Sequence, residues 1–488
     1  MLARLDSHPC LPDPEAQAKI THLLVILPAG MELPEDCPDR QILTALLARR
    51  DKKLDDLTKT PLAAPLGNRL VAWCRLDTQR PPFEQFSLLR RATQLLLDEQ
   101  PAHLDIVATG TPEFRSQAIE AAAYVALTNG APLPTLKRKD APKPLQILTL
   151  WGSLPGTQPA ALAEANLLAR TLTALPPNLL TPGAYRERVR QLAADLGWDI
   201  EEYDSARLRP LGAGAFLAVA SGSTHDDAAI VHLSYRPKGF CNSIALVGKG
   251  ICFDTGGHNL KPAKGMAGMH EDMSGSAVAL GILLAATRLR LPVRIDAWLA
   301  LARNELSPNA YRQGDVITAL DGSSIEIVHT DAEGRLVLAD TLTLAVREQP
   351  HLLIDFATLT GSMVTALGTR YAGLFASSEA LARLALEAGV ACGERLCLFP
   401  MDEDYDEELE SSIADLKQCT LESDADHILA ARFLSRFVGA TPWLHLDLSA
   451  ASHKGGLGAL ASTQTGFGVA WGLEFFFFFL RDHGKPMT

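Results

Sequence analysis

Apolar runs alternate with stretches of helical spacing through the first 155 or so residues. The apolar runs predict strands, and the spaced stretches between them predict helices. The predicted strands are 23–27, 104–108 and 145–151, and the predicted helices are 84–99 and 117–127. This alternation predicts a small N-terminal α/β domain.

The pattern changes beyond residue 175, where several runs are apolar at almost every position. Such runs are typical of strands buried on both faces of a sheet. They lie at 244–247, 293–302, 352–357 and 444–448, with helical patterns at 273–289 and 336–348. We expect a larger α/β domain with a helix-covered central sheet, and ligand sites in such sheets lie beyond the carboxyl ends of the strands.

A proline-rich zone separates the two patterns, and an Ala/Leu-rich helix is expected at 160–174. The predicted organisation is an N-terminal domain at 1–157, a linker helix at 158–175 and the larger domain at 176–488.

Composition narrows the class of protein. The chain of 488 residues is 47% hydrophobic and 21% charged, enough to pack a globular interior, and its net charge of −12 argues against nucleic-acid or anionic-membrane binding. No apolar run approaches the ~20 residues that span a bilayer. The most apolar run, 475–480, is expected to be a buried element. Eight scattered cysteines suit a reducing compartment, so we expect a cytoplasmic protein.

Charged residues interrupt a glycine-rich apolar segment at 245–278. A strand runs into Lys249, which has glycine on both sides, and a second apolar run ends at Asp254. Glycines let the backbone turn sharply and let a ligand approach closely. Lys261 follows, and Asp272 opens a helix of small residues, where a carboxylate suits the positive end of the helix dipole.

A second charged segment lies at 325–340. An apolar strand is expected to end at Val328, and Asp331 and Glu333 would share one side of an extended chain. A helix is expected to begin near Arg335, where free N–H groups favour an anion.

Four carboxylates near strand ends would repel one another by several kcal/mol. Asp254, Asp272, Asp331 and Glu333 carry four negative charges, which two divalent cations would balance. Oxygen ligands with one nitrogen suit zinc, manganese or magnesium. Lys249 can ligate only when neutral, so nearby cations would have to lower its pKa from roughly 10.4.

Other interpretations are possible for these residues. Any single charged residue here could form a surface salt bridge on a loop. A two-metal phosphoesterase would also cluster carboxylates, but it should show more basic residues than Lys261, Lys264 and Arg335. A hexameric scaffold or DNA-binding protein is a non-enzymatic alternative.

The two charged segments resemble the signature segments of the leucine aminopeptidase (cytosol aminopeptidase) family. They read GKGICFDTGGHNLKP and HTDAEGRLVLAD. Segments at 176–182, 309–316, 358–362 and 465–469 are similar to other family segments. The resemblance covers about 175–470 and makes the larger domain the catalytic one.

The resemblance implies a metallo-exopeptidase that hydrolyses the N-terminal residue from peptides with a water activated by two metals. It implies that two ions are held by Lys249, Asp254, Asp272, Asp331 and Glu333, with Asp254 and Glu333 bridging them. Lys261 would stabilise the oxyanion, and Arg335 would hold bicarbonate as the general base.

The resemblance also implies a substrate pocket and an assembly. Met269 and Thr358 would line a pocket for an apolar, leucine-like side chain, and the assembly would be a homohexamer. His258 and His329 depart from the family pattern. Together with His270 they lie within the motifs, where contact with substrate or metal stays open.

Overall fold

The computed structural model describes residues 2–422 and 424–483, which form two units. The first unit comprises Met1–Leu167 with two later insertions, Val390–Glu394 and His453–Thr465. The remainder forms the second unit, and α5 (Gln158–Ala174) begins in the first and ends in the second. The domain limits suggested by the sequence stay a prediction.

The first unit contains a six-stranded sheet in the order β1-β6-β5-β2-β4-β3. Every neighbouring pair is parallel except β3 and β4. Its strands are β1 (Arg4–His8), β2 (His22–Pro28), β3 (Leu62–Leu66), β4 (Arg69–Leu76), β5 (His103–Ala108) and β6 (Ile147–Trp151). Its helices are α1 (Pro14–Lys19), α2 (Arg40–Arg49), the 3₁₀ helix η1 (Leu54–Thr58), α3 (Pro82–Leu97) and α4 (Pro112–Asn129).

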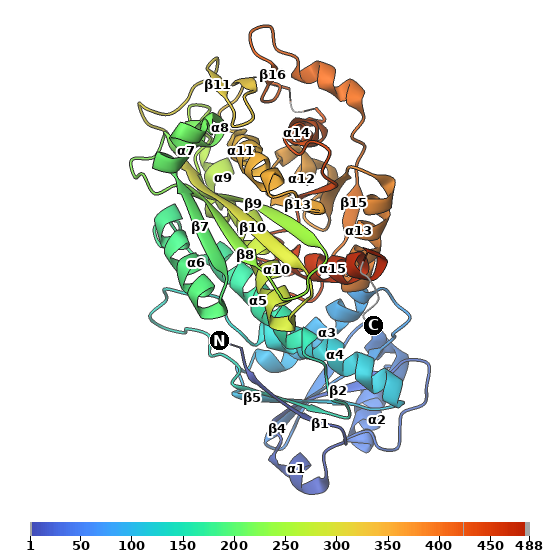
Figure 1. The fold of residues 1–488 in the computed structure, drawn as a ribbon. Coiled ribbons are helices and arrows are strands. Elements are labelled where there is room, and N and C mark those ends of the chain that lie inside the picture. The colour runs from blue at the N-terminus through green and yellow to red at the C-terminus, as the bar shows by residue number, and fades with distance from the viewer. Residues whose placement is uncertain (1, 423, 484–488) are drawn as a thin grey trace. The chain divides into compact units, whose positions relative to one another are not determined.

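Separate hydrophobic clusters lie on the two faces of this sheet. One is built around α3 and α4, and the other around α2 and η1. Figure 1 labels α2, α3 and α4 beside the strands of this sheet. Both long helices begin at a proline, and the Thr111 hydroxyl caps α4 by accepting from the Phe114 amide. The α/β prediction for this region is confirmed.

The second unit contains an eight-stranded mixed sheet in the order β15-β14-β17-β13-β9-β10-β8-β7. Its strands are β7 (Asp199–Asp204), β8 (Ala229–Tyr235), β9 (Ser243–Asp254), β10 (Arg294–Asn304), β13 (Leu352–Ala357), β14 (Ala372–Ala376), β15 (Leu396–Leu398) and β17 (Trp443–Asp447). The central strands β17, β13, β9 and β10 are mutually parallel. A small sheet joins β11 (Val316–Thr318), β12 (Ser324–Glu326) and β16 (Leu416–Lys417).

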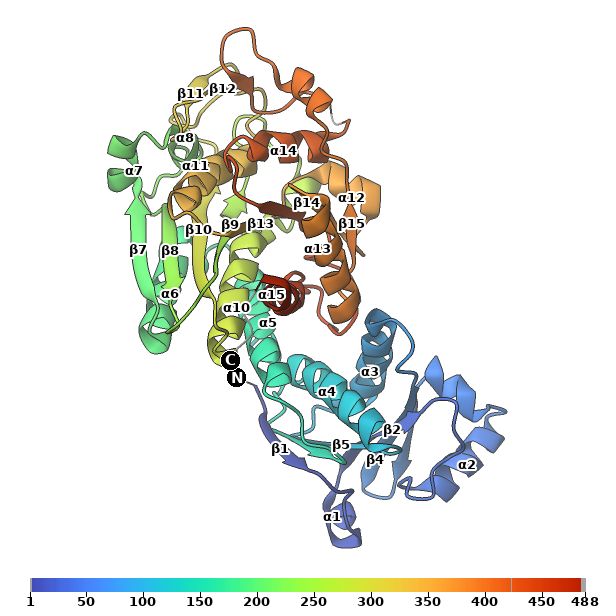
Figure 2. The same ribbon diagram turned by 45° about the vertical axis from the view of Figure 1, so that its right-hand side comes forward.

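Helices cover both faces of the larger sheet (Figure 2). A hydrophobic cluster joins α8, α11 and α14 to one face, while α10 packs against β9, β10, β13 and α15 outside that cluster. The helices are α6 (Pro182–Leu196), α7 (Ser205–Leu211), α8 (Gly214–Ala220), α9 (Ala263–Met266), α10 (Ser274–Leu289), α11 (Glu333–Arg347), α12 (Gly361–Leu367), α13 (Glu379–Cys392), α14 (Asp426–Ser435) and α15 (Val469–His483), with 3₁₀ helices η2 (Met269–Glu271) and η3 (Glu403–Leu409).

The close packing of α10 on the sheet depends on glycine. A Cβ atom at Gly275 would lie 2.0 Å from the carbonyl oxygen of Phe356 on β13. Only glycine therefore fits there without moving the helix. This contact brings the start of α10, and Asp272 just before it, against the central strands.

Three local predictions from the sequence were wrong. The strand at 244–247 and the apolar run after it form one continuous strand, β9, in which Gly248 packs under α10 and Gly250 packs mainly against β10 without interrupting the ladder. The strand expected to end at Val328 ends at Glu326 instead, and it is the short β12 of the small sheet. Helix α11 begins at Glu333, so Asp331 lies in a turn and the two carboxylates do not alternate along a strand.

One segment among the described residues, Ala263–Leu289, is apolar and long enough to be considered as a membrane span. It includes α10, and 83% of its most apolar window is buried inside the fold. Burial to this extent is typical of a helix in the core of a globular fold. The apolar run at 475–480 lies in α15, where Phe475 and Phe476 are fully buried, as expected.

Candidate metal centre

The candidate site lies where the central parallel strands of the larger sheet end. Asp254 is the last residue of β9, Asn304 the last of β10 and Asp447 the last of β17, while Thr358 directly follows β13. Because parallel strands end at the same edge of a sheet, side chains from distant parts of the sequence meet there.

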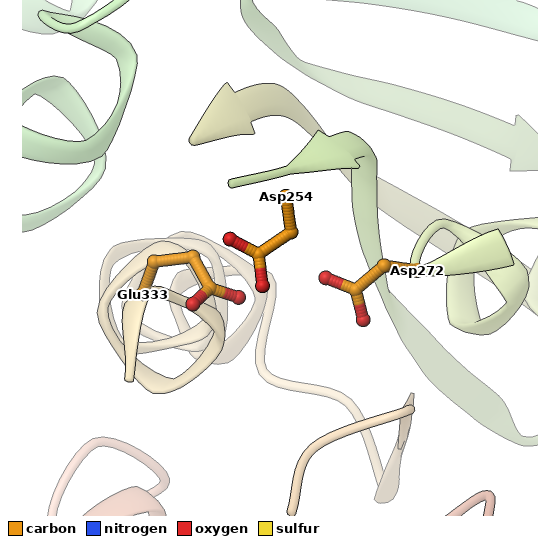
Figure 3. Close-up of side chains that lie close together, drawn as sticks. All are labelled: Asp254, Asp272 and Glu333. Carbon is orange, nitrogen blue, oxygen red and sulfur yellow. The ribbon is translucent and has the colours of Figure 1, made fainter. Parts of the chain in front are cut away.

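Three carboxylates converge at this edge (Figure 3). Asp254, Asp272 and Glu333 are buried, and each offers an oxygen within 4.8 Å of the others. Glu333 extends from the first turn of α11 towards Asp254, and Asp272 faces both from the segment before α10 (Figure 3). The Oε2 atom of Glu333 is buried without a hydrogen-bond partner among the described residues.

Two lysines partner these carboxylates. The Lys249 ammonium lies 2.9 Å from Asp272 and 2.8 Å from Glu333. The Lys261 ammonium lies 2.9 Å from Asp254 and 2.5 Å from Asp331. Asp331 is thus joined to the site through Lys261 and does not belong to the three-carboxylate cluster.

Burial and mutual repulsion shift the protonation of the carboxylates. Burial raises the pKa of Asp272 to about 8, with Lys249 opposing the shift and Glu333 adding to it. Burial and the charge of Asp254 raise the pKa of Asp331 to about 7. The same two causes raise the pKa of Glu333. Without a metal these carboxyl groups are therefore harder to ionise than in water, and they outnumber the two lysines.

The ammonium of Lys249 is strongly stabilised. Burial alone lowers its pKa, but the charges of Asp272, Glu333 and Asp254 outweigh burial and hold the pKa well above its ordinary value. The ammonium also donates to the Thr358 carbonyl at 3.1 Å. Lys249 acts here as a counter-ion, and divalent cations would have to displace its proton before it could ligate one.

A cavity of about 470 Å³ opens onto the carboxylates. Met269 and Thr358 both line it, together with Val364, Leu448 and Ala451. The Thr358 hydroxyl donates to Asp272 at 2.7 Å, so its methyl group remains for contact with a ligand. The volume suits a small organic ligand or one end of a peptide.

Arg335 is buried in α11 and does not line this cavity. Its Nη2 atom donates to Asp426 at 2.7 Å and its Nη1 atom to the Gln418 carbonyl at 3.0 Å. The sequence predicted that this guanidinium holds a free anion, and it did not predict a contact with Asp426 or Gln418.

The three histidines within the motifs have different surroundings. His258 is exposed, while His270 and His329 are half-buried. His329 Nδ1 accepts from the Asp331 amide at 3.2 Å, and burial with nearby Lys261 lowers the pKa of His329. None of the three belongs to the metal-competent cluster found among the described residues.

Several residues that hold the site were missed by sequence reasoning. The Asn304 amide donates to Asp254 at 2.8 Å, and Tyr311 and Asn304 both donate to the Thr330 carbonyl. Asp447 accepts from the Leu359 amide and the Thr360 hydroxyl in the loop that lines the cavity. Asn304 and Asp447 had a usable signal, because each is a polar residue at or near the end of a mostly apolar run.

Fold and site together define an α/β protein whose buried carboxylates and lysine amines are suited to divalent metal ions. Residues 167–471 match the model of the cytosol aminopeptidase family, catalytic domain. The chain belongs to the cytosol aminopeptidase family, as the two charged segments suggested. This family consists of metal-dependent enzymes, and nothing in the comparisons supports the phosphoesterase or scaffold alternatives.

Relatives are similar over most of the chain. The chain is 42% identical to a probable cytosol aminopeptidase of Gluconobacter oxydans over 66% of its own length and 64% of the relative's. It is 39% identical to one of Roseiflexus castenholzii over 74% of the chain and 75% of the relative. The solved bottromycin maturation enzyme BotP, in complex with Mn, matches with a TM-score of 0.80 and 31% identity, covering 93% of this chain and 98% of that one.

Proposed function

We propose that the protein is an aminopeptidase that removes the N-terminal residue from peptides with two divalent metal ions. The observation that carries the proposal is the convergence of Asp254, Asp272 and Glu333 around one buried space, with Lys249 and Lys261 at its sides. Family membership supports the same conclusion.

The residues fit a pair of divalent ions. The Oε2 atom of Glu333 is buried without a partner among the described residues. Burial and mutual repulsion raise the carboxyl pKa values of Asp272 and Asp331, and bound cations would relieve both effects. We assign the ions to Lys249, Asp254, Asp272, Asp331 and Glu333. Divalent ions bound there supply Lewis acidity that lowers the pKa of water and polarises a carbonyl.

The remaining side chains position the substrate. Lys261 lines the cavity beside Asp254 and Asp331, where its ammonium can donate to the oxygen that becomes negative as the peptide carbonyl is attacked. Met269 and Thr358 contribute an apolar wall of the cavity, so we propose an apolar, leucine-like residue at the substrate N-terminus.

Arg335 donates two of its five N–H groups to Asp426 and to the Gln418 carbonyl. Its other N–H groups would hold bicarbonate, which would serve as the general base.

Metal analysis combined with hydrolysis of leucine p-nitroanilide tests the proposal. Zinc, manganese and magnesium are the candidate ions, and manganese is the first to test because the solved relative contains it. Chelation should abolish hydrolysis and added metal should restore it. Glu333→Ala should lose both metal and activity, whereas Asp321→Ala, which removes an exposed carboxylate outside the cavity, should keep both. Full activity after chelation refutes the proposal.

The assembly and compartment are proposed on family grounds alone. We propose a homohexamer acting in the cytoplasm, and the names of its relatives support the compartment alone. Light scattering that gives a monomer at working concentration would contradict the assembly.

A further inference from the structure

The loop that carries Lys261 is tightly folded. It spans residues 255–261, directly after β9. The Lys261 amide donates to the Thr255 carbonyl at 2.9 Å, which closes the base of the loop. Gly256 has a φ of +86°, and a Cβ atom there would lie 2.5 Å from the Asn259 carbonyl oxygen, so glycine is required at this turn. A small change at one position of this loop is therefore transmitted to the others.

Asn259 joins this loop to Thr330, the residue before Asp331. The Thr330 amide donates to the side-chain oxygen of Asn259 at 2.9 Å, and the Asn259 amide donates to the Thr330 hydroxyl at 2.8 Å. That hydroxyl in turn donates to the Gly256 carbonyl at 2.6 Å. Three hydrogen bonds thus hold the loop against a fully buried residue.

Thr330 is also fixed from its other side. Its carbonyl accepts from the Asn304 side chain at 3.0 Å and from the Tyr311 hydroxyl at 2.6 Å. Neither of these bonds depends on Asn259. Removing the Asn259 side chain should therefore loosen the loop of Lys261 while Thr330 and the adjacent Asp331 stay in place.

Lys261 depends on the position of this loop. Its ammonium lies 2.9 Å from Asp254 and 2.5 Å from Asp331, and its side chain is 16% exposed in the wall of the cavity. A lysine has a flexible four-carbon side chain, so its amine is placed accurately only when its backbone is held. A displacement of about 1 Å at a reacting centre can cost roughly 100-fold in rate.

We propose that Asn259 is a positioning residue for Lys261, because its side chain ties the loop of Lys261 to Thr330 beside Asp331. Asn259 is not among the residues that line the cavity, so it acts through Lys261 and does not touch the substrate. The catalytic part of this inference rests on the proposed aminopeptidase function, whereas the placement of Lys261 does not.

The test compares wild type with three variants. Asn259→Ala removes the acceptor of the Thr330 amide, whereas Asn259→Asp keeps an oxygen in that place. The control Gln313→Ala removes only an exposed partner of the Asn259 side chain, 3.4 Å away.

Two measurements are made on each protein. The first is the rate at which acetic anhydride acetylates Lys261 in the presence of chelator, followed by mass spectrometry with the exposed Lys264 as internal reference. The second is kcat and KM for leucine p-nitroanilide after metal loading, with the metal content measured.

Asn259→Ala should raise the acetylation of Lys261 relative to Lys264 by roughly 2- to 10-fold, as expected when one ordinary hydrogen bond no longer holds the loop. Its kcat should fall by roughly 10- to 100-fold at unchanged metal content, while its KM should stay within about twofold because Lys261 acts on the transition state. Asn259→Asp should recover most of the loss, and Gln313→Ala should behave as wild type. A residue needed only for stability would not give a loss confined to kcat.

Two results would overturn the inference. One is a folded Asn259→Ala protein in which Lys261 is acetylated no faster than in wild type. The other is an Asn259→Asp protein as impaired as Asn259→Ala. If alanine prevents folding, Thr330→Val removes the hydroxyl that binds the loop and replaces it in the test. A wild type without any peptidase activity would sink the proposed function, while the acetylation rates would still decide the role of Asn259.

Discussion

Gly334, the second residue of α11, faces the Lys249 side chain so closely that alanine should not fit. A Cβ atom there would lie 2.7 Å from Lys249 Cε, 2.8 Å from Lys249 Nζ and 2.9 Å from Leu359 Cδ1. Ordinary contact begins at 3.4 Å, so the lysine would have to move by about 0.7 Å. It cannot retreat freely, because Asp272, Glu333 and the Thr358 carbonyl hold its ammonium.

The magnitude follows from two opposing effects of Gly334→Ala. Overpacking costs about 1–3 kcal/mol, and alanine in a helix returns about 1 kcal/mol. The net loss of stability is about 0–2 kcal/mol, which lowers Tm by a few degrees. The effect on catalysis should be larger, since a displacement near 1 Å can cost about 100-fold in rate.

The assay pairs thermal unfolding with leucine p-nitroanilide hydrolysis and metal analysis. Gly361→Ala is the control for stability, because Gly361 begins α12 and a Cβ there meets no atom within 4 Å. This control should unfold at or above the wild-type temperature. A Gly334→Ala protein that is as stable as wild type and hydrolyses the substrate equally fast would refute the view that Lys249 is fixed.

Three further predictions concern charge. Lys249→Met should cost the metal-free protein roughly 3–5 kcal/mol in urea unfolding with chelator, because Asp272 and Glu333 lose their buried cation; an unchanged midpoint would contradict this pairing. Burial lowers the pKa of His445, but the charge of Asp355, 2.6 Å away, outweighs burial and raises it. The stability that this pair contributes is complete below about pH 6.5 and is lost as the pH rises through the folded-state pKa. The free energy of unfolding of wild type should therefore fall more than that of His445→Asn between about pH 6 and pH 9. If the two free energies changed with pH in parallel, the His445–Asp355 pair would contribute nothing. Metal at about 100 times its Kd should stabilise the protein by about 2.7 kcal/mol, and an unmoved Tm would mean that the folded cluster holds no ion.

The linear pattern predicted the elements of the larger sheet well. The apolar runs at 352–357 and 444–448 became β13 and β17, because strands buried on both faces must be apolar at nearly every position. The predicted helices at 273–289 and 336–348 match α10 and α11 to within about three residues.

The sequence was weaker wherever close packing decided the geometry. It divided β9 at its glycines, although both stay in the strand, where Gly248 packs closely under α10 and Gly250 packs closely against β10. It also treated Asp331 and Glu333 as alternating strand residues, although one lies in a turn and the other begins a helix. A glycine in the sequence is equally compatible with a turn and with a close contact to another element. Only the position of that element in the fold distinguishes the two.

The sequence by itself predicted which residues carry the chemistry, namely the charged residues set in apolar, glycine-rich surroundings near strand ends. Only the tertiary structure decided their partners. It paired Lys249 with Asp272 and Glu333, placed Asn304 beside Asp254, and brought Asp426 onto Arg335 across 91 positions of the chain. Spacing along a chain constrains local geometry alone, whereas an ion pair between distant segments exists only after the sheet and its helices have packed.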